Sequence, residues 1–247
     1  LQQLPGVAVG TEGMTGLYVR GGGADENLYL LDGNPVYHVN HLLGFFSAFN
    51  PDAIKNTRFY KGSFPAEYGG RLSSVVDVRM NDGNRQEYHG NISVGLLSAR
   101  ANLEGPIVKD RSSFNVSVRR TWLDLITGTA LAIVNKNSDT KESFGYHFFD
   151  INAKVNHSFS ERSRAYLSFY MGQDAFRQGS KEKHEDSDDM FLWRWGNLIG
   201  SAGWNYVFGQ KLFGNLMVGY SRFRSHIRQE AKGYEIEGNR AERQSIK

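Results

Sequence analysis

Two arginines of this sequence stand beside glycine pairs, which raises the question of which acidic residue would pair with each of them. Arg20 begins the run RGGG, and Arg71 follows a glycine pair in AEYGGRLSSVVDV (66–78). Glycine pairs mark turns, and an apolar β-forming run follows Arg71. A guanidinium that the fold buries needs a carboxylate partner. No residue near Arg71 in sequence obviously supplies one, so a buried Arg71 would need a partner from a distant segment.

Two histidines have a spacing that could serve a metal ion. His38 and His41 in YHVNHLL are three residues apart, which could place both imidazoles on one face of a helix. No third ligand stands beside them. We therefore favour a loop that contacts a bound molecule over a metal site.

The run KEKHEDSDDM (181–190) offers carboxylates that could hold calcium. It lacks the ordered odd-position spacing and the glycine of a calcium loop. A solvated loop is the favoured interpretation.

No motif in the sequence indicates an enzyme. The glycines at 21–23 belong to neither GxxxxGK[ST] nor GxGxxG, and no helical pattern follows them. Asp32 and Gly33 in LLDG are better interpreted as turn residues at the end of a strand. No serine, histidine and aspartate combination stands in a catalytic motif, and the chain has no cysteine to act as a nucleophile. We expect no catalytic site and no cofactor.

Composition narrows the class of protein further. The chain has 247 residues, and 29 Lys and Arg stand against 26 Asp and Glu without a basic stripe, so nucleic acid is not an expected partner. The apolar runs are far shorter than the ~20 residues of a membrane helix, which leaves a transmembrane barrel possible. The sequence opens at Leu1 without a signal peptide. We expect an exported protein to be represented here by an internal piece.

The first part of the chain, roughly residues 1–84, predicts a small mixed α+β unit. Short strand-like runs alternate with glycines, and 40–54 could supply one or two helical turns. The unit is too short and too rich in glycine to hold a large core. The strand-like runs are GLYVRGG (16–22), NLYLLDG (27–33), TRFYKG (57–62) and LSSVVDVRM (72–80).

From about Tyr88 the pattern changes to an alternation of apolar and polar residues. In RAYLSFYMG (164–172), Ala165, Leu167, Phe169 and Met171 share one face. The same period of two recurs in 148–159 and 197–208. These segments predict strands with one apolar and one polar face.

Such strands occur in soluble sandwiches and in transmembrane barrels. The predicted strands are roughly 9–12 residues long, where soluble strands have about 5–6. Short connections (107–113, 160–163, 209–211) alternate with long polar ones (127–146, 176–190), as periplasmic turns and external loops do. Both features favour the membrane barrel, as do aromatic residues near strand ends: Trp122, Phe148, Phe149, Phe159, Trp204, Tyr206 and Phe208.

The alternation slips phase between Leu96 and Leu97, which predicts a tight hairpin near 96–99, with a β-bulge as the alternative. With the hairpin we expect about seven strands, fewer than the ~8 that close the smallest barrels. The sequence should therefore stop within a barrel. The expected strands are 88–96, 99–105, 113–125, 146–159, 163–176, 191–208 and 212–228.

Four segments of the sequence stand in order and at close spacing: VRGG (19–22), LLDGNPVY (30–37), FNPDAIKNTRFYKGSFPAEYGGRLSSVVDV (49–78) and LEGPI (103–107). Together they closely resemble the plug and first barrel strands of TonB-dependent outer-membrane receptors, most of all the Bacteroidota-type members with a carboxypeptidase-like regulatory domain. The resemblance runs from about Leu4 to Leu125. It implies a β fold: an N-terminal α+β plug (1–84), then the first ~7 antiparallel strands of a large, ~22-stranded transmembrane β-barrel (85–247).

The resemblance also implies roles for individual residues. Arg20 and Arg71 match plug arginines that face carboxylates on the inner barrel wall, on strands expected outside this sequence. Tyr37, His38 and His41 would lie at the plug apex, where ligand contact is expected. The structural motif of the plug would include Gly21, Gly22, Asp32, Gly33, Gly69 and Gly70.

The function implied by the resemblance is energised uptake across the outer membrane. The expected partners are the TonB–ExbB–ExbD complex, reached through a segment outside this sequence, membrane lipid or lipopolysaccharide, and a glycan or oligopeptide ligand with a surface lipoprotein. Two alternatives stay open. One is an iron–siderophore receptor of the same fold, and the other is a structural or binding subunit that does not transport.

Overall fold

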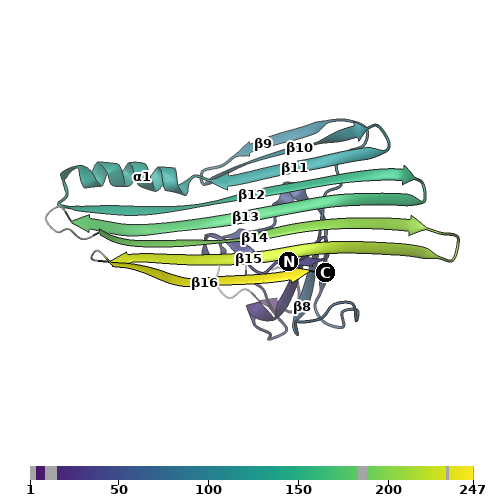
Figure 1. The fold of residues 1–247 in the computed structure, drawn as a ribbon, viewed down its shortest axis with the longest axis horizontal. Coiled ribbons are helices and arrows are strands. Elements are labelled where there is room, and N and C mark those ends of the chain that lie inside the picture. Colours follow the sequence, from purple (N-terminus) through teal and green to yellow (C-terminus); the bar gives the residue numbers. More distant parts are fainter. Residues whose placement is uncertain (1–3, 9–15, 183–187, 232–233, 247) are drawn as a thin grey trace.

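The computed structural model describes residues 4–8, 16–182, 188–231 and 234–246, and these residues are mostly in β-strands. The largest feature is an eight-stranded antiparallel sheet in which each strand pairs with its neighbours in sequence (Figure 1). Its strands are β9 (His89–Val94), β10 (Ser98–Val108), β11 (Ser112–Thr121), β12 (Thr140–Ser160), β13 (Ser163–Glu182), β14 (Asp188–Val207), β15 (Phe213–Ala231) and β16 (Tyr234–Ile246).

A smaller N-terminal unit packs on one face of this sheet. It contains a four-stranded mixed sheet of order β4-β3-β8-β7, in which β3 and β8 are parallel. Its elements are β1 (Val7–Ala8), β2 (Tyr18–Val19), β3 (Asn27–Leu31), β4 (Asn34–Pro35), β5 (Asn40–His41), β6 (Phe46–Ser47), β7 (Ile54–Tyr60) and β8 (Ser74–Met80). Three 3-10 turns join them: Ala24–Glu26, Leu42–Gly44 and Pro51–Ala53.

The core of the N-terminal unit is apolar but small, as predicted. Apolar residues of the predicted strand-like runs pack together between the small sheet and the segments that cross it. Two residues of the large sheet, Tyr170 and Ile199, complete this core. Its other buried members are Leu17, Val19, Leu31, Val36, Val76, Val78 and Met80.

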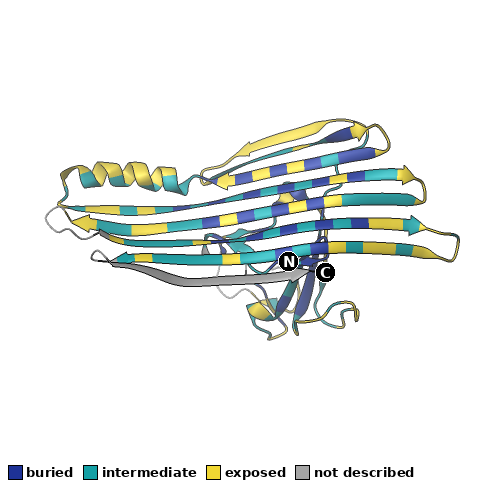
Figure 2. Ribbon diagram, viewed as in Figure 1, coloured by how far each residue is buried: buried dark blue, intermediate teal, exposed yellow. Residues whose placement is uncertain are grey.

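The two faces of the large sheet differ in polarity. The face that packs on the N-terminal unit, here called the inner face, contains the buried residues of the sheet (Figure 2). Most of these residues are polar. The opposite, outer face exposes apolar side chains, including Val116, Val118, Val155, Leu167, Phe169, Trp204, Leu216 and Val218. The predicted alternation is therefore confirmed, with the apolar face outside.

The hairpin predicted near 96–99 is confirmed. Val94 of β9 pairs with Ala99 of β10, and the Gly95 N–H donates a hydrogen bond to the Ser98 carbonyl at 2.8 Å. The turn reverses the chain, which explains the change of phase between Leu96 and Leu97.

The sequence prediction was wrong at the segment after β11. The predicted strand 113–125 ends at Thr121, and helix α1 (Leu123–Val134) occupies part of the predicted loop 127–146. β11 pairs with β12 only as far as Phe149, so the start of β12 pairs with β13 on one edge and has no strand on the other. The helix covers this edge: the Thr127 hydroxyl donates to the Phe144 carbonyl at 2.9 Å, and the Asn135 side-chain amide exchanges hydrogen bonds with the Glu142 backbone.

The sequence prediction also gave too few and too short strands. The sheet has β16 as an eighth strand, and β13 and β14 extend into the predicted loop 176–190. The extensions were missed because residues 177–182 and 188–189 are mostly polar on both faces of their strands, so the period of two disappears from the sequence. Residues 183–187 of the acidic run lie outside the described residues.

In the described part of the chain, no helix is long and apolar enough to cross a membrane.

Gly83 lies at the joint between the two sheets and provides a test of how tightly they meet. Its φ is +80°, and a Cβ there would lie 2.1 Å from the Phe114 carbonyl oxygen. Gly70 is a matched control, because its φ is a similar +83° and a Cβ there would have no atom within 4 Å. We expect Gly83→Ala to lower the free energy of unfolding by about 3 kcal/mol or more and Gly70→Ala by about 1 kcal/mol. Thermal unfolding of the detergent-solubilised protein measures both; equal losses would show that the joint is loose.

Candidate functional site

His41 makes a buried polar contact between the N-terminal unit and the large sheet. Its Nδ1 lies 2.7 Å from Asp174 Oδ2, and its Nε2 lies 2.9 Å from Asp150 Oδ1. Ionised carboxylates only accept hydrogen bonds, so both ring nitrogens must carry protons. His41 is therefore an imidazolium cation of the N-terminal unit, held between two carboxylates of β12 and β13.

The two carboxylates are balanced by further groups on the inner face. Arg119 Nε lies 2.8 Å from Asp150 Oδ2, and its terminal nitrogen donates to the Ser47 carbonyl at 2.7 Å. The Tyr146 hydroxyl donates to Asp174. With His41 and Arg119 against Asp150 and Asp174, the buried cluster has two positive and two negative charges, and each carboxylate is paired.

Enclosure also explains the acid–base behaviour of His41. The residue is only 3% exposed, and its ring stacks on Phe148 at 4.1 Å between centroids. Burial lowers the pKa of His41, but the hydrogen bonds that its ring donates to Asp150 and Asp174 outweigh burial and raise the pKa to about 9. The neighbouring His38 lacks such partners, and burial lowers its pKa, so only one of the two imidazoles is charged at neutral pH.

A second charged contact has the opposite polarity. Lys154 of β12 reaches into the N-terminal unit, where its Nζ lies 3.3 Å from Asp32 and 3.1 Å from Asp82. Asp82 also pairs with Lys55 at 2.7 Å. Burial raises the pKa of Asp82, but the contacts with Lys55 and Lys154 outweigh it and lower the pKa. Here the acids belong to the N-terminal unit and the cation to the large sheet.

Neutral hydrogen bonds occupy the space around the two charged contacts. The Asn50 amide donates to Ser117 Oγ at 2.6 Å, and the Asn197 amide donates to the His38 carbonyl at 2.7 Å. Most of the groups that meet at this interface are therefore polar and paired. The buried polar residues on the inner face are Ser113, Asn115, Ser117, Arg119, Thr121, Asp150, Asn152, Lys154, Asn156, Ser168, Asp174, Asn197, Ser201 and Ser221.

The two glycine-flanked arginines lie elsewhere. Arg20 is exposed beside β2, and Arg71 is half-buried and donates to the Gly70 carbonyl at 2.8 Å. Within the described ranges, neither forms an ion pair with a carboxylate. Their pairing with further strands stays a prediction. The glycines beside them, Gly21 and Gly70, have positive φ as turns require.

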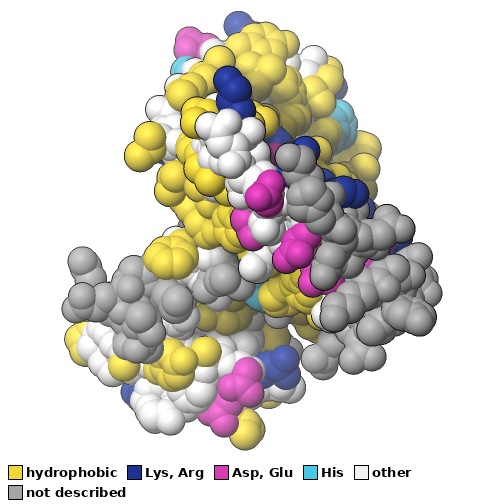
Figure 3. Space-filling model, turned by 90° about the vertical axis from the view of Figure 1, so that its left-hand side faces the viewer, with side chains coloured by type: hydrophobic (Ala, Val, Ile, Leu, Met, Phe, Trp, Pro, Cys, Tyr) yellow, Lys and Arg dark blue, Asp and Glu magenta, His cyan; other side chains and the backbone are white. Residues whose placement is uncertain are grey.

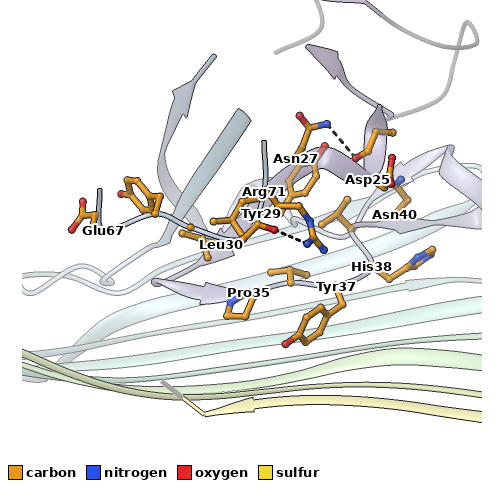
Figure 4. Close-up of a pocket in the computed structure, with 17 residues that line it drawn as sticks. Asp25, Asn27, Tyr29, Leu30, Pro35, Tyr37, His38, Asn40, Glu67 and Arg71 are labelled. Carbon is orange, nitrogen blue, oxygen red and sulfur yellow. Dashed lines mark hydrogen bonds between the residues drawn. The ribbon is translucent and has the colours of Figure 1, made fainter. Parts of the chain in front are cut away.

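Arg71 instead lines a cavity of about 560 Å³ in the N-terminal unit (Figure 4). Glu67 lies at one end of this cavity, Asp25 and His38 lie at the other, and Arg71 lies between them. Of the three residues predicted at the apex, Tyr37 and His38 line the cavity. His41 points into the inner face, and it lies in β5 rather than on a helix with His38.

No group of acidic or histidine side chains in the described ranges is arranged to hold a metal ion. Asp32 and Gly33 form the turn after β3, as predicted, with φ values of +45° and +82°. Asp32 also has a role that the sequence did not indicate, because its carboxylate accepts from both Lys154 and the Met80 N–H.

Comparison with known proteins agrees with this arrangement. Residues 1–76 match the family model of the TonB-dependent Receptor Plug Domain. No curated protein matches the chain. The N-terminal unit is thus a plug domain, and the large sheet is part of a transmembrane β-barrel whose inner face holds it. The protein is an outer-membrane protein.

Several solved structures have a related fold. The siderophore receptor PirA from Acinetobacter baumannii is 15% identical, with 92% of this chain and 45% of the receptor covered and a TM-score of 0.48. The siderophore receptor PirA from Pseudomonas aeruginosa is 17% identical, with 99% of this chain and 49% of the receptor covered and a TM-score of 0.43. A mutant of the ferric enterobactin receptor PfeA from Pseudomonas aeruginosa, in complex with enterobactin, is 14% identical. The match covers 92% of this chain and 43% of the receptor, with a TM-score of 0.46. The chain spans less than half the length of these receptors.

His41 predicts how the attachment of the plug depends on pH. Its pKa rises from 6.5 to about 9 on folding, so its contribution is complete below pH 6.5 and is lost as the pH rises through 9. We expect His41→Gln to lower the free energy of unfolding at pH 7 by about 3 kcal/mol and to remove much of the loss near pH 9. Urea unfolding of the detergent-solubilised protein, followed by tryptophan fluorescence, measures both effects.

The matched control is His89→Gln, since His89 is on β9 and its side chain is 54% exposed. It should leave the stability and its pH dependence unchanged. A His41→Gln protein that retained the full loss of stability near pH 9 would contradict the assignment of a charged His41.

Proposed function

We propose that the protein is a TonB-dependent outer-membrane receptor that takes up its ligand by energised transport, with residues 1–84 as the plug and 85–247 as part of the barrel. The observation that carries this proposal is the composition of the interface. Ion pairs and hydrogen bonds hold the plug to the inner face at His41, Lys154, Asn50 and their partners, alongside apolar contacts with Tyr170 and Ile199.

Such an interface suits a plug that must move. Hydrogen bonds and ion pairs can be exchanged for contacts with water, so their net free energy is small compared with their gross strength. An apolar interface of the same extent would expose hydrocarbon to water when it opens. The plug keeps its own apolar core, so it can be displaced without losing all of its packing.

The energy for displacement would come from the TonB–ExbB–ExbD complex acting on the plug. A receptor that does not transport would need no such coupling. The same barrel and plug in a structural or binding subunit would leave the interface closed whether or not TonB is present.

The lining of the plug cavity bears on the class of ligand. Tyr29, Tyr37 and Tyr68 provide aromatic faces, and Asp25 and Arg71 provide charged groups. Burial raises the pKa of Tyr29 to about 12, so its phenol keeps its proton. This mixture suits a glycan or oligopeptide, captured with a surface lipoprotein as in Bacteroidota-type receptors.

An iron–siderophore complex is the second candidate ligand, and siderophore receptors are among the solved structures named above. Growth of a deletion strain on oligosaccharides or peptides, compared with its growth under iron limitation, separates the two classes.

The transport proposal is tested by labelling a buried plug residue in cells. Ala48 is 1% exposed and its carbonyl accepts from the Tyr170 hydroxyl, so the conservative Ala48→Cys places a thiol within the interface. The chain has no cysteine of its own. We expect a membrane-impermeant maleimide to label Ala48→Cys several-fold faster in cells with TonB than in cells without it.

The control is Glu182→Cys, since Glu182 is exposed at the end of β13 and should be labelled equally in both strains. Equal labelling of Ala48→Cys with and without TonB would favour the structural subunit and would reject energised opening.

A further inference from the structure

The first part of β12 has an open edge that a strand could occupy. Residues 140–148 pair with β13 on one side, and within the described ranges no strand lies on the other side. The backbone groups of Glu142, Phe144 and Phe148 point toward this open edge, because side chains of residues 121–135 bond to them. Unpaired backbone groups along a strand edge favour pairing with a further strand.

Helix α1 covers this edge through side chains and packs on it loosely. The Thr127 hydroxyl donates to the Phe144 carbonyl, and the Asn135 amide binds both the N–H and the carbonyl of Glu142. Asn135 thus contacts the same groups that a neighbouring strand would bind. No residue of α1 is buried, and a cavity of about 690 Å³ lies between the helix and β12–β14.

The sequence of α1, LDLITGTALAIV, favours a helix only weakly. It contains Gly128, and the preceding Trp122 provides no side-chain hydrogen bond to the first turn. Glycine and β-branched residues have low helix propensity, and β-branched residues favour strands. The β-branched residues of the helix are Ile126, Thr127, Thr129, Ile133 and Val134.

The register of β11 leads directly onto the open edge. Arg120 is opposite Phe149, and each further residue of β11 would be opposite the preceding residue of β12. An extended segment 122–129 would therefore run beside residues 140–147. In this alignment Thr129 would be opposite Thr140, at the start of β12.

The side-chain pattern of the segment suits both conformations. Odd-numbered residues of β11, such as Ser117 and Arg119, are on the inner face. Extension of β11 would turn Leu123 and Leu125 to that face, on the side of Tyr146. Leu123 already packs against the buried cluster that contains Tyr146. Leu125 is 61% exposed on the helix and would gain this contact.

The helix also leaves other apolar side chains in solvent. Hydrophobic side chains gather on the upper part of the end of the sheet that holds α1 (Figure 3), and Ile126, Ile133 and Val134 contribute to them. The helical form is therefore stabilised by its own backbone hydrogen bonds and by few packing contacts.

We propose that residues 122–129 form a conformational switch, with helix α1 as one state and an extension of β11 along the open edge of β12 as the other. Each state satisfies the backbone groups of the segment, in the helix internally and in the strand through β12. Two packings of one segment interconvert when their free energies are close. The strand state raises the wall of the sheet beside β12 and leaves residues 130–139 as the connection. This inference needs only the large sheet and stands whether or not the protein transports.

A disulfide that only the strand state allows tests the switch. In that state the Cα atoms of Thr129 and Thr140 would be about 5.5 Å apart, within the range of a disulfide. In the helical state Thr129 precedes Asn135 by about 9 Å of helix, and Thr140 lies about 7 Å beyond Glu142, the partner of Asn135. The chain has no cysteine of its own. We expect Thr129→Cys and Thr140→Cys to form a disulfide in native outer membranes under mild oxidation.

Two further substitutions should change the rate of cross-linking in opposite directions. Asn135→Ala removes two hydrogen bonds that hold the helix on the edge, so cross-linking should be roughly tenfold faster. Ile126→Ala should make it about threefold slower, because alanine prefers helices and isoleucine prefers strands. A maleimide-polymer gel shift, followed over time, measures each rate.

The matched control is the pair Thr129→Cys and Lys141→Cys. Neighbouring residues of a strand point to opposite faces, so this pair should remain reduced in both states. Heat-modifiable migration in gels confirms that each variant is folded. Three results would each overturn the proposal: no disulfide between positions 129 and 140 even with Asn135→Ala, equal cross-linking of both pairs, or a rate that Asn135→Ala does not raise.

Discussion

The structure depends on the rule that a charge enclosed between two packed sheets must meet an opposite charge. The inner face of the large sheet is lined by buried acids, amides, hydroxyls and a lysine, and the plug supplies partners for several of them, among them Asp150, Lys154 and Asn197. His41 is the clearest case, because its ring has a carboxylate at each nitrogen and a phenyl ring against its face. Without the plug these carboxylates would lose a cation, and the inner face would need water in its place.

This rule connects the fold to the proposed activity. A plug held by paired charges fits in one register, since His41 needs partners at defined places on β12 and β13, and Lys154 of β12 needs partners at defined places on the plug. The same contacts tolerate replacement by water, so the interface can be specific when closed and still open under an external force. The outer face follows a different requirement, because its exposed apolar side chains contact lipid.

The parts of the fold that follow from local periodicity could be predicted from the sequence. The strands at 148–159 and 164–172 and the hairpin after Val94 are examples, since a period of two and its change of phase are visible in the residues. Helix α1 was not predicted, because its first residues continue the strand-like run 113–125 and the rest lies in the connection 127–146, which was interpreted as a polar loop. The contacts of the helix with the edge of β12 are tertiary and leave no local signal. The partners of His41 lie 109 and 133 positions away. Their types, Asp150 and Asp174 on the polar parity of adjacent strands, were the available signal, but nothing local links them to His41.

The most direct test of the central claim is a disulfide between plug and barrel. Asn34 of β4 lies against Gly219 of β15, where an added Cβ would be 2.5 Å from the Asn34 Cγ. The chain has no cysteine, so a pair of Asn34→Cys and Gly219→Cys can react only with itself. In native outer membranes under mild oxidation, both thiols should become protected from a maleimide-polymer gel shift. In the control pair Asn34→Cys and Val218→Cys, the second side chain is on the outer face and the thiols should stay reactive. Thiols that remain equally reactive in both pairs would contradict a plug seated on this inner face.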